Sequence, residues 1–325
     1  MSKKISFEEF KGAIDSRMLP AEKIGDYVEL DPDSPIPKLI FKSDALTDEA
    51  PDDYDVDEEI YQLTQHYKDN EFEKDRIFNS QEISRSSRGS TTRSGSGSAP
   101  VRGRIVVAEG DSWFNLPPLI RPTAIADRIW WNRTYNIKNI ARWGHTLKTI
   151  LHQGQHLRTL EHYRPDYFLL SAGGNDLQQG LASGTFLHAY DPRRPLHDYL
   201  TTQAERGFEE IAENYRTLLT QVSAKFPSTK TITYGYDYPR PLVGNGRYIG
   251  QFLHRQGFPR EVMTELVRPS IEELNNRIRS VSQEFRNVTF INCLNVTNDF
   301  TWYDDMHPSS EGFVALTRKF EETMR

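Results

Sequence analysis

Short apolar runs alternate with longer helix-like segments from residue 104 to the end of this 325-residue chain. Each run is short and largely apolar, as a buried strand is. The intervening segments are long enough to cross over a sheet and join parallel strands. We expect strands near residues 104–109, 135–140, 166–172, 229–236 and 288–293, and helices near 122–131, 146–161, 205–226, 263–285 and 309–324. The pattern predicts an α/β protein, with a three-layer α/β/α domain around a five-stranded parallel sheet.

Three glycine-containing motifs come directly after the first three predicted strands. They are Gly110-Asp111-Ser112, Gly144 and Gly173-Gly174-Asn175-Asp176. Ligands of parallel sheets bind beyond the carboxyl ends of the strands, so these motifs are expected to share one site. Ser112 is therefore a candidate nucleophile, although Gly-Asp-Ser also describes many surface turns.

A histidine near the end of the chain is the candidate base for this serine. A serine hydroxyl becomes nucleophilic when a base removes its proton and a third group orients that base. His307 precedes Pro308 at a predicted loop-to-helix boundary, and Asp304 lies three residues earlier, within reach of the imidazole Nδ1. Asp305 is the alternative for the orienting role.

Acyl transfer also requires hydrogen-bond donors directed at the developing oxyanion. The backbone N–H groups of Ser112 and Gly144 and the side-chain amide of Asn175 are candidates, because all three follow predicted strands. Taken singly, Gly144 also fits a turn at a helix start, and Asn175 fits an Asx-turn.

Together with Asn139–His145, these motifs resemble the sequence blocks of the SGNH hydrolases, the GDSL esterase/lipase family. The resemblance covers about residues 101–325. It implies a flavodoxin-like SGNH hydrolase fold, no cofactor and no metal. It also implies a catalytic triad of Ser112, His307 and Asp304. The implied oxyanion hole consists of Ser112, Gly144 and Asn175. The Asp-x-x-His block of the family favours Asp304 over Asp305.

Three further residues beside these motifs are expected to support or line the pocket. Trp113 stands where the family often has leucine, and it fits a bulky pocket wall. Asp111 is interpreted as a scaffold residue of the site rather than a metal ligand, and Asp176 as a supporting residue.

Two long stretches leave the same edge of the predicted sheet as the candidate site residues. Residues 178–206 and 236–268 are rich in aromatic residues and arginine, and we interpret them as lids rather than surface insertions. Four arginines in them could meet an anionic substrate, although solvated side chains are the simpler interpretation: Arg193, Arg194, Arg240 and Arg247.

Two alternative chemistries find little support. His152 and His156 have the i,i+4 spacing of a zinc pair and follow His145, but no glutamate follows His152 and no third ligand is evident. An exposed helix face is the preferred interpretation. The chain also lacks a Gly-x-Gly-x-x-Gly phosphate loop.

The first hundred residues differ from the rest of the chain. Residues 1–78 predict a small acidic region, with a helix beginning at the capping box Ser6–Glu9, another within 60–78, and a solvated acidic run at 44–59. Phe7, Phe10, Ile14 and Met18 fall on one face of this first helix, which is expected to be amphipathic. Residues 79–103, rich in Ser, Arg and Gly, predict a flexible linker to the domain at 104–325.

Composition limits the possible partners. The net charge of −6 argues against general nucleic-acid binding, which needs a basic face. No segment has the length and hydrophobicity of a signal peptide or a membrane span, so a cytoplasmic protein is expected. The single cysteine, Cys293, lies in an apolar run and is expected to be a buried thiol.

The sequence thus predicts a serine hydrolase that cleaves carboxylic esters through an acyl-serine, with a small-molecule, lipid or carbohydrate ester as substrate. One alternative is an O-deacetylase of acetylated carbohydrate. The other is a partner-binding protein, in which residues 1–78 bind a protein that regulates the hydrolase domain.

Overall fold

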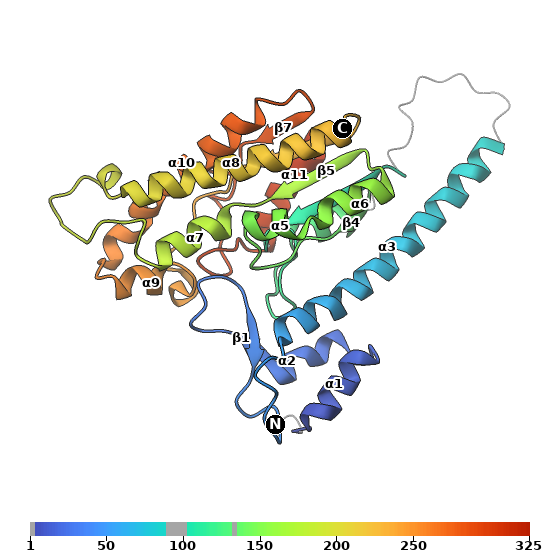
Figure 1. Ribbon diagram of the computed structural model, residues 1–325, viewed down its shortest axis with the longest axis horizontal. Coiled ribbons are helices and arrows are strands. Elements are labelled where there is room, and N and C mark those ends of the chain that lie inside the picture. The colour runs from blue at the N-terminus through green and yellow to red at the C-terminus, as the bar shows by residue number, and fades with distance from the viewer. Residues whose placement is uncertain (1–3, 89–102, 132–134) are drawn as a thin grey trace.

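The computed structural model describes residues 4–88, 103–131 and 135–325. A five-stranded parallel sheet forms its centre, with the strands in the order β4-β3-β5-β6-β7 (Figure 1). The strands are β3 Ile105–Gly110, β4 Asn136–Asn139, β5 Tyr167–Ser171, β6 Lys230–Tyr234 and β7 Val288–Ile291. β5 is buried along its whole length, as expected for a central strand covered on both faces. The predicted sheet is confirmed.

Helices cover both faces of the sheet. α4 (Ile125–Trp131) packs against α11 (Ser310–Thr323) on one face. On the other face lie α5 Leu147–Gln153, α6 Gln155–Tyr163, α8 Thr202–Lys225 and α10 Arg260–Ser282. The single helix predicted over 146–161 is two helices, because Gly154 takes a left-handed conformation (φ 58°) that ends α5 and starts α6.

Two short helices overlap the stretches predicted as lids. α7 (Gly174–Ala182) contains the start of the first stretch, and α9 (Gly250–Arg255) lies within the second. Short 3₁₀ turns occur at Leu196–Asp198 and Val243–Gly246. The connections are therefore shorter than predicted, because polar residues after β5 and β6 form helical turns packed on the domain.

The amino-terminal residues form a small module with its own core, which we call the N-terminal module (residues 4–88). Its elements are α1 Phe7–Asp15, a 3₁₀ turn at Ala21–Lys23, α2 Ile24–Tyr27, β1 Val28–Leu30, β2 Leu39–Phe41 and α3 Val56–Arg88. The capping box is confirmed, since Ser6 and Glu9 bond each other's backbone N–H. α1 ends at Asp15, so Met18 lies outside the helix and is 76% exposed, contrary to prediction.

The predicted borders of this region need two corrections. α3 continues to Arg88, so its last ten residues occupy positions predicted as linker; the remainder of that segment, 89–102, lies outside the described residues. The acidic run at 44–59 is not uniformly solvated, because Asp57 is only 6% exposed and pairs with Arg142. A paired carboxylate can be buried where an isolated one would favour solvent.

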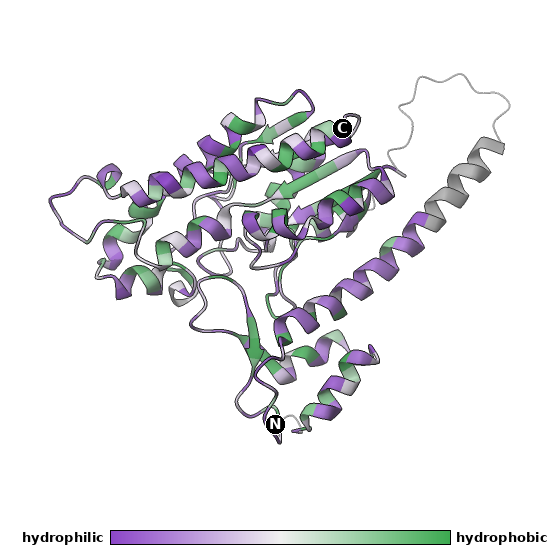
Figure 2. Ribbon diagram, in the orientation of Figure 1, coloured by the Kyte–Doolittle hydropathy of each residue, from purple (hydrophilic) through white to green (hydrophobic). Residues whose placement is uncertain are grey.

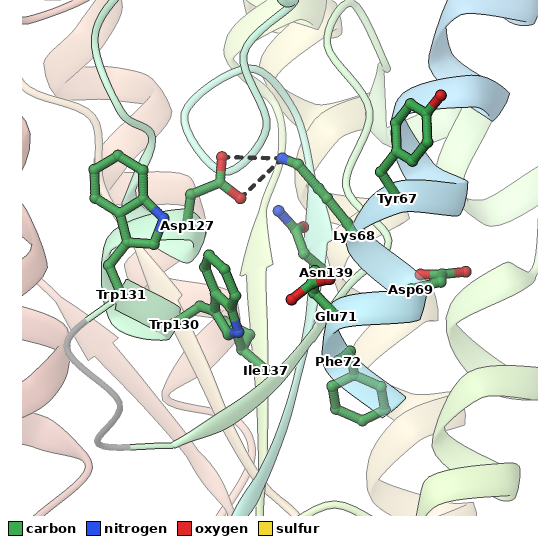
Figure 3. A pocket seen from close by; sticks show the side chains of 10 residues that line it. All are labelled: Tyr67, Lys68, Asp69, Glu71, Phe72, Asp127, Trp130, Trp131, Ile137 and Asn139. Atoms are coloured by element: carbon green, nitrogen blue, oxygen red, sulfur yellow. Dashed lines mark hydrogen bonds and ion pairs between the residues drawn. The ribbon is translucent and has the colours of Figure 1, made fainter. Parts of the chain in front are cut away.

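α3 extends along the β4 edge of the sheet, and its surface is mostly hydrophilic (Figures 1 and 2). Between α3 and α4 lies a groove of about 270 Å³, beside the ion pair of Lys68 with Asp127 (Figure 3). Trp130 and Trp131 form its other side. In the part of the chain that the structure describes, no helix is long and apolar enough to span a membrane.

Candidate active site

Ser112 lies at the turn that follows β3, at the carboxyl edge of the sheet. β3 ends at Gly110, whose φ of 151° and close contact with β5 both require glycine: a Cβ there would lie 2.1 Å from the Ser171 carbonyl oxygen. The chain then turns, and the Phe114 N–H donates to the Asp111 carbonyl. Ser112 is only 1% exposed.

His307 connects Ser112 to Asp304. Its Nε2 lies 2.8 Å from Ser112 Oγ, and its Nδ1 lies 2.9 Å from both carboxylate oxygens of Asp304. The His307 backbone N–H also donates to Asp304 Oδ1 at 2.7 Å. When Nδ1–H donates to the Asp304 carboxylate, Nε2 is free to accept the proton of Ser112, so His307 and Asp304 together can activate the serine.

Asp305 serves a different purpose from its neighbour. Its carboxylate accepts the backbone N–H groups of Tyr248, Ile249 and Gly250, at 2.5 to 3.1 Å. Burial raises the pKa of Asp305 to about 7, although these hydrogen bonds oppose the shift. Asp305 thus anchors the start of α9, and Asp304 alone contacts the imidazole.

One hydrogen bond links two of the segments that carry the candidate oxyanion donors. Asn175, in the first turn of α7, donates from Nδ2 to the carbonyl of His145, the residue after Gly144, at 2.8 Å. The second N–H of this amide remains available. The backbone N–H groups of Ser112 and Gly144 donate no hydrogen bond to any described residue. Ser112 and Asn175 line one cavity, whereas Gly144 is not among its lining residues.

The three residues expected to support the site have different surroundings. Asp111 is buried beneath Ser112, where Oδ1 accepts the Ser171 hydroxyl at 2.6 Å. Trp113 lines the cavity and donates from Nε1 to the carbonyl of Met306, beside His307. Asp176 accepts the N–H of Leu147 at the start of α5, and burial raises its pKa to about 6.

The cavity beside Ser112 is small and mainly apolar, with a volume of about 40 Å³. Its apolar walls come from α7, α10, the residue before α9 and the loop before His307, and include Leu177, Leu181, Ile249, Val267, Ile271 and Met306. The second predicted lid stretch therefore contributes to the cavity. The first contributes only residues of α7, because residues 183–201 do not line it.

The four arginines of the long stretches do not line this cavity. Arg193 pairs with Asp191, and the Arg194 guanidinium lies over the ring of Tyr199. Arg240 lies over the ring of Trp302, and Arg247 donates to the carbonyl of Leu30.

The histidines weighed as a zinc pair have different surroundings. His156 is buried and stacks on Phe168, with ring centroids 6.2 Å apart, while His152 is exposed. Burial lowers the pKa of His145 and of His156 to about 4. Among the described residues, no group of three or more His, Cys, Asp or Glu side chains could hold a metal ion.

Two contributors to the site were missed from the sequence. Tyr236 donates its hydroxyl to Asp111 Oδ2 at 2.5 Å, and it follows β6, so the strand-end argument could have identified it. Asp57 contacts Arg142 and Trp143 just before Gly144. No local signal marks Asp57, because its partners lie 85 and 86 residues away in the sequence.

Three solved structures illustrate what this chain is similar to, each at low sequence identity. A protein from Parabacteroides merdae, provisionally assigned as a GDSL-like lipase, is 15% identical over 67% of this chain and 94% of its own, with a TM-score of 0.45. A catalytic mutant of Axe2, an acetylxylan esterase from Geobacillus stearothermophilus, is 14% identical over 68% and 93%, with a TM-score of 0.43. LAE5, an α/β hydrolase from the metagenome of Lake Arreo, is 14% identical over 69% and 97%, with a TM-score of 0.42.

Comparison with curated protein sequences finds no match. Residues 90–315, by contrast, match the GDSL-like lipase/acylhydrolase family, and this range contains every residue of the candidate triad and oxyanion hole. The chain is therefore a serine ester hydrolase, and it belongs to the GDSL-like lipase/acylhydrolase family.

Proposed function

We propose that this protein cleaves carboxylic esters through an acyl-serine formed on Ser112, with His307 as the base and Asp304 as the residue that orients it. The observation that carries the proposal is the continuous path from Ser112 Oγ through both ring nitrogens of His307 to the Asp304 carboxylate. All three side chains are buried, which keeps the path in a region of low dielectric constant.

The reaction proceeds in two acyl transfers. His307 Nε2 takes the Ser112 proton as Oγ attacks the ester carbonyl, and the oxyanion accepts hydrogen bonds from the N–H groups of Ser112 and Gly144 and from Asn175 Nδ2. The imidazolium then gives its proton to the leaving alcohol, and the acyl-serine remains. Water, deprotonated by His307, attacks this ester, and collapse of the second intermediate returns the proton to Ser112 and releases the acid.

The size of the cavity favours a short acyl group. A volume of about 40 Å³ holds roughly three water-sized groups, since one water-sized group needs about 10 to 15 Å³ of such space. An acetyl group fits this space, while a long acyl chain would need the walls formed by α7, α10 and Ile249 to move. This favours the O-deacetylase alternative, with an acetylated alcohol or sugar as substrate, over a long-chain lipase.

A series of p-nitrophenyl esters from acetyl to decanoyl tests both parts of the proposal. We expect kcat/KM to fall steeply beyond butyryl, and Ile271→Ala, which enlarges the cavity, to shift the optimum to longer chains. Phe252→Ala is the matched control, because Phe252 lies on α9 but does not line the cavity. Rising activity with chain length would contradict the short-acyl assignment, and no hydrolysis of any ester would contradict the esterase.

A further inference from the structure

The loop that carries Gly144 is held from outside the hydrolase domain. Residues 139–143 connect β4 to Gly144, and α3 of the N-terminal module runs beside them. The Gln65 side chain donates to the carbonyl of Asn139 at 2.6 Å, and the Tyr61 hydroxyl donates to the carbonyl of Ile140 at 3.2 Å. Two successive turns of α3, at Tyr61 and Gln65, therefore form hydrogen bonds with this loop.

Asp57, at the start of α3, bonds the two residues that directly precede Gly144 in the sequence. Its Oδ1 accepts the indole N–H of Trp143 and the backbone N–H of Leu39, both at 2.8 Å. Its Oδ2 accepts from the Arg142 guanidinium at 3.0 Å, and Glu58 pairs with the same guanidinium. A single buried carboxylate therefore ties β2 of the N-terminal module to the two residues that precede Gly144.

Trp143 belongs to the core of the N-terminal module. It is 1% exposed and packs with buried residues of α1, α2, β2 and α3, including Tyr61, whose ring meets the indole edge-on at 5.6 Å. The residue next to a candidate oxyanion donor is thus fixed by a hydrophobic core built from the first 63 residues.

The loop between β1 and β2 approaches the same site. A Cβ on Gly144 would lie 2.8 Å from the Pro37 carbonyl oxygen and 3.6 Å from Ile36 Cδ1. The end of β1 and the same loop also contact residues 247–255, the segment that contains Ile249 of the cavity wall: Leu30 accepts from Arg247, Pro32 accepts from Gln251, and Asp33 pairs with Arg255.

We infer that the N-terminal module is part of the catalytic apparatus, and that Asp57 is a positioning residue that fixes the Gly144 N–H through Arg142 and Trp143. The inference rests on the esterase proposed above. On its other side, Gly144 is held by hydrolase elements, through the Asn175 bond to His145 and the Asp176 bond to Leu147. An oxyanion donor acts only in the correct place, and an error of about 1 Å can cost as much as 100-fold in rate.

Two conservative variants test this in the full-length protein. Asp57→Asn keeps the shape of the side chain but removes the charge facing Arg142, and Trp143→Phe keeps an aromatic ring in the core but removes the N–H bonded to Asp57. Asp53→Asn is the matched control, since Asp53 lies four residues away in the same acidic run and is exposed. One sample of each protein is labelled to completion with a fluorophosphonate to count its reactive serines. The kcat for p-nitrophenyl acetate is measured on an unlabelled sample and divided by that count.

We expect kcat per reactive serine to fall by about 10- to 100-fold in Asp57→Asn and by about threefold or more in Trp143→Phe. KM should change little, because the oxyanion exists only after attack. Asp53→Asn should match the wild type.

If the folded variants keep the wild-type kcat per reactive serine, the inference is wrong, even if fewer of their molecules are labelled. The module would then only stabilise the fold. If Asp57→Asn does not fold, Trp143→Phe decides by the same measurement. Failure of the wild-type protein to hydrolyse the ester would instead refute the proposed function, so the two failures are distinguishable.

Discussion

Asp304 and Asp305 are adjacent in the sequence, yet their carboxylates bond different parts of the chain. Asp304 lies 2.9 Å from His307 Nδ1, while Asp305 accepts three consecutive backbone N–H groups, those of residues 248–250. The chain thus uses one acidic pair to orient the candidate base and to anchor the segment that covers the cavity.

This division predicts different effects of two matched substitutions. Asp304→Asn should lower kcat by about 10³- to 10⁴-fold, because an amide can hold His307 in the wrong tautomer. Asp305→Asn should keep kcat within about tenfold and raise KM, because it loosens Ile249, a residue that lines the cavity. Kinetics with p-nitrophenyl acetate check both; equal losses of kcat would contradict the division.

Gly144→Ala should impair both activity and stability. Gly144 has a φ of 75°, which costs an L-residue about 1 kcal/mol or more, and a methyl group would lie 2.8 Å from the Pro37 carbonyl. We expect kcat to fall by about 10²-fold, with a lower free energy of unfolding in urea. Gly257→Ala is the control, since it also has positive φ but no atom lies within 4 Å of its Cβ position. A Gly144→Ala variant with wild-type kcat and stability would contradict the claim that this loop needs glycine at position 144.

Glu109 should make stability fall as the pH rises. Burial raises its pKa to about 8 from a usual value of 4.5, against the bond from the Gly110 N–H. Its contribution is fully present below about pH 4.5, where both states are protonated. It is lost as the pH rises towards 8, because only the unfolded chain ionises freely.

Glu109→Gln should therefore gain stability relative to the wild type between about pH 4.5 and 8. Its own stability should still decline, since the raised pKa values of Asp176 and Asp305 remain. Urea unfolding across this pH range measures the difference, and parallel curves for the two proteins would contradict the assignment.

Tyr236→Phe should weaken the support beneath Ser112. The variant leaves Asp111 Oδ2 without its 2.5 Å donor in a buried position, which costs about 1 to 3 kcal/mol of the free energy of unfolding. We expect kcat to fall as well, because Asp111 begins the turn that carries Ser112. Tyr238→Phe, whose hydroxyl bonds Glu272 in a partly buried position, is the control and should change less. Equal effects would show that the bond to Asp111 has no special role.

Most of the fold and the core of the site could be predicted from sequence. The strands were identifiable because β3 and β5 are short, largely apolar runs, and Ser112 and Asn175 follow them within a few residues. His307 was identifiable because its orienting carboxylate lies only three residues away. In each case the deciding interaction is local, or follows from the shared edge of a parallel sheet.

The contribution of the N-terminal module could not be predicted, because it depends on distant contacts. Asp57 stands in an acidic run that, by composition, predicts a solvated surface; its burial depends on Arg142 and Trp143, more than eighty residues later. The end of α3 was missed for the opposite reason, since the Ser- and Arg-rich composition of residues 79–88 predicts a linker although the helix continues.

Mass spectrometry of the intact protein after reaction with a fluorophosphonate tests the central claim most directly. We expect one adduct on the wild type, located on the peptide that contains Ser112, together with complete loss of p-nitrophenyl acetate hydrolysis. Ser112→Ala should gain no adduct and should hydrolyse no ester. An adduct of equal yield on Ser112→Ala, or a wild type that neither reacts nor hydrolyses, would contradict the assignment of Ser112 as the nucleophile.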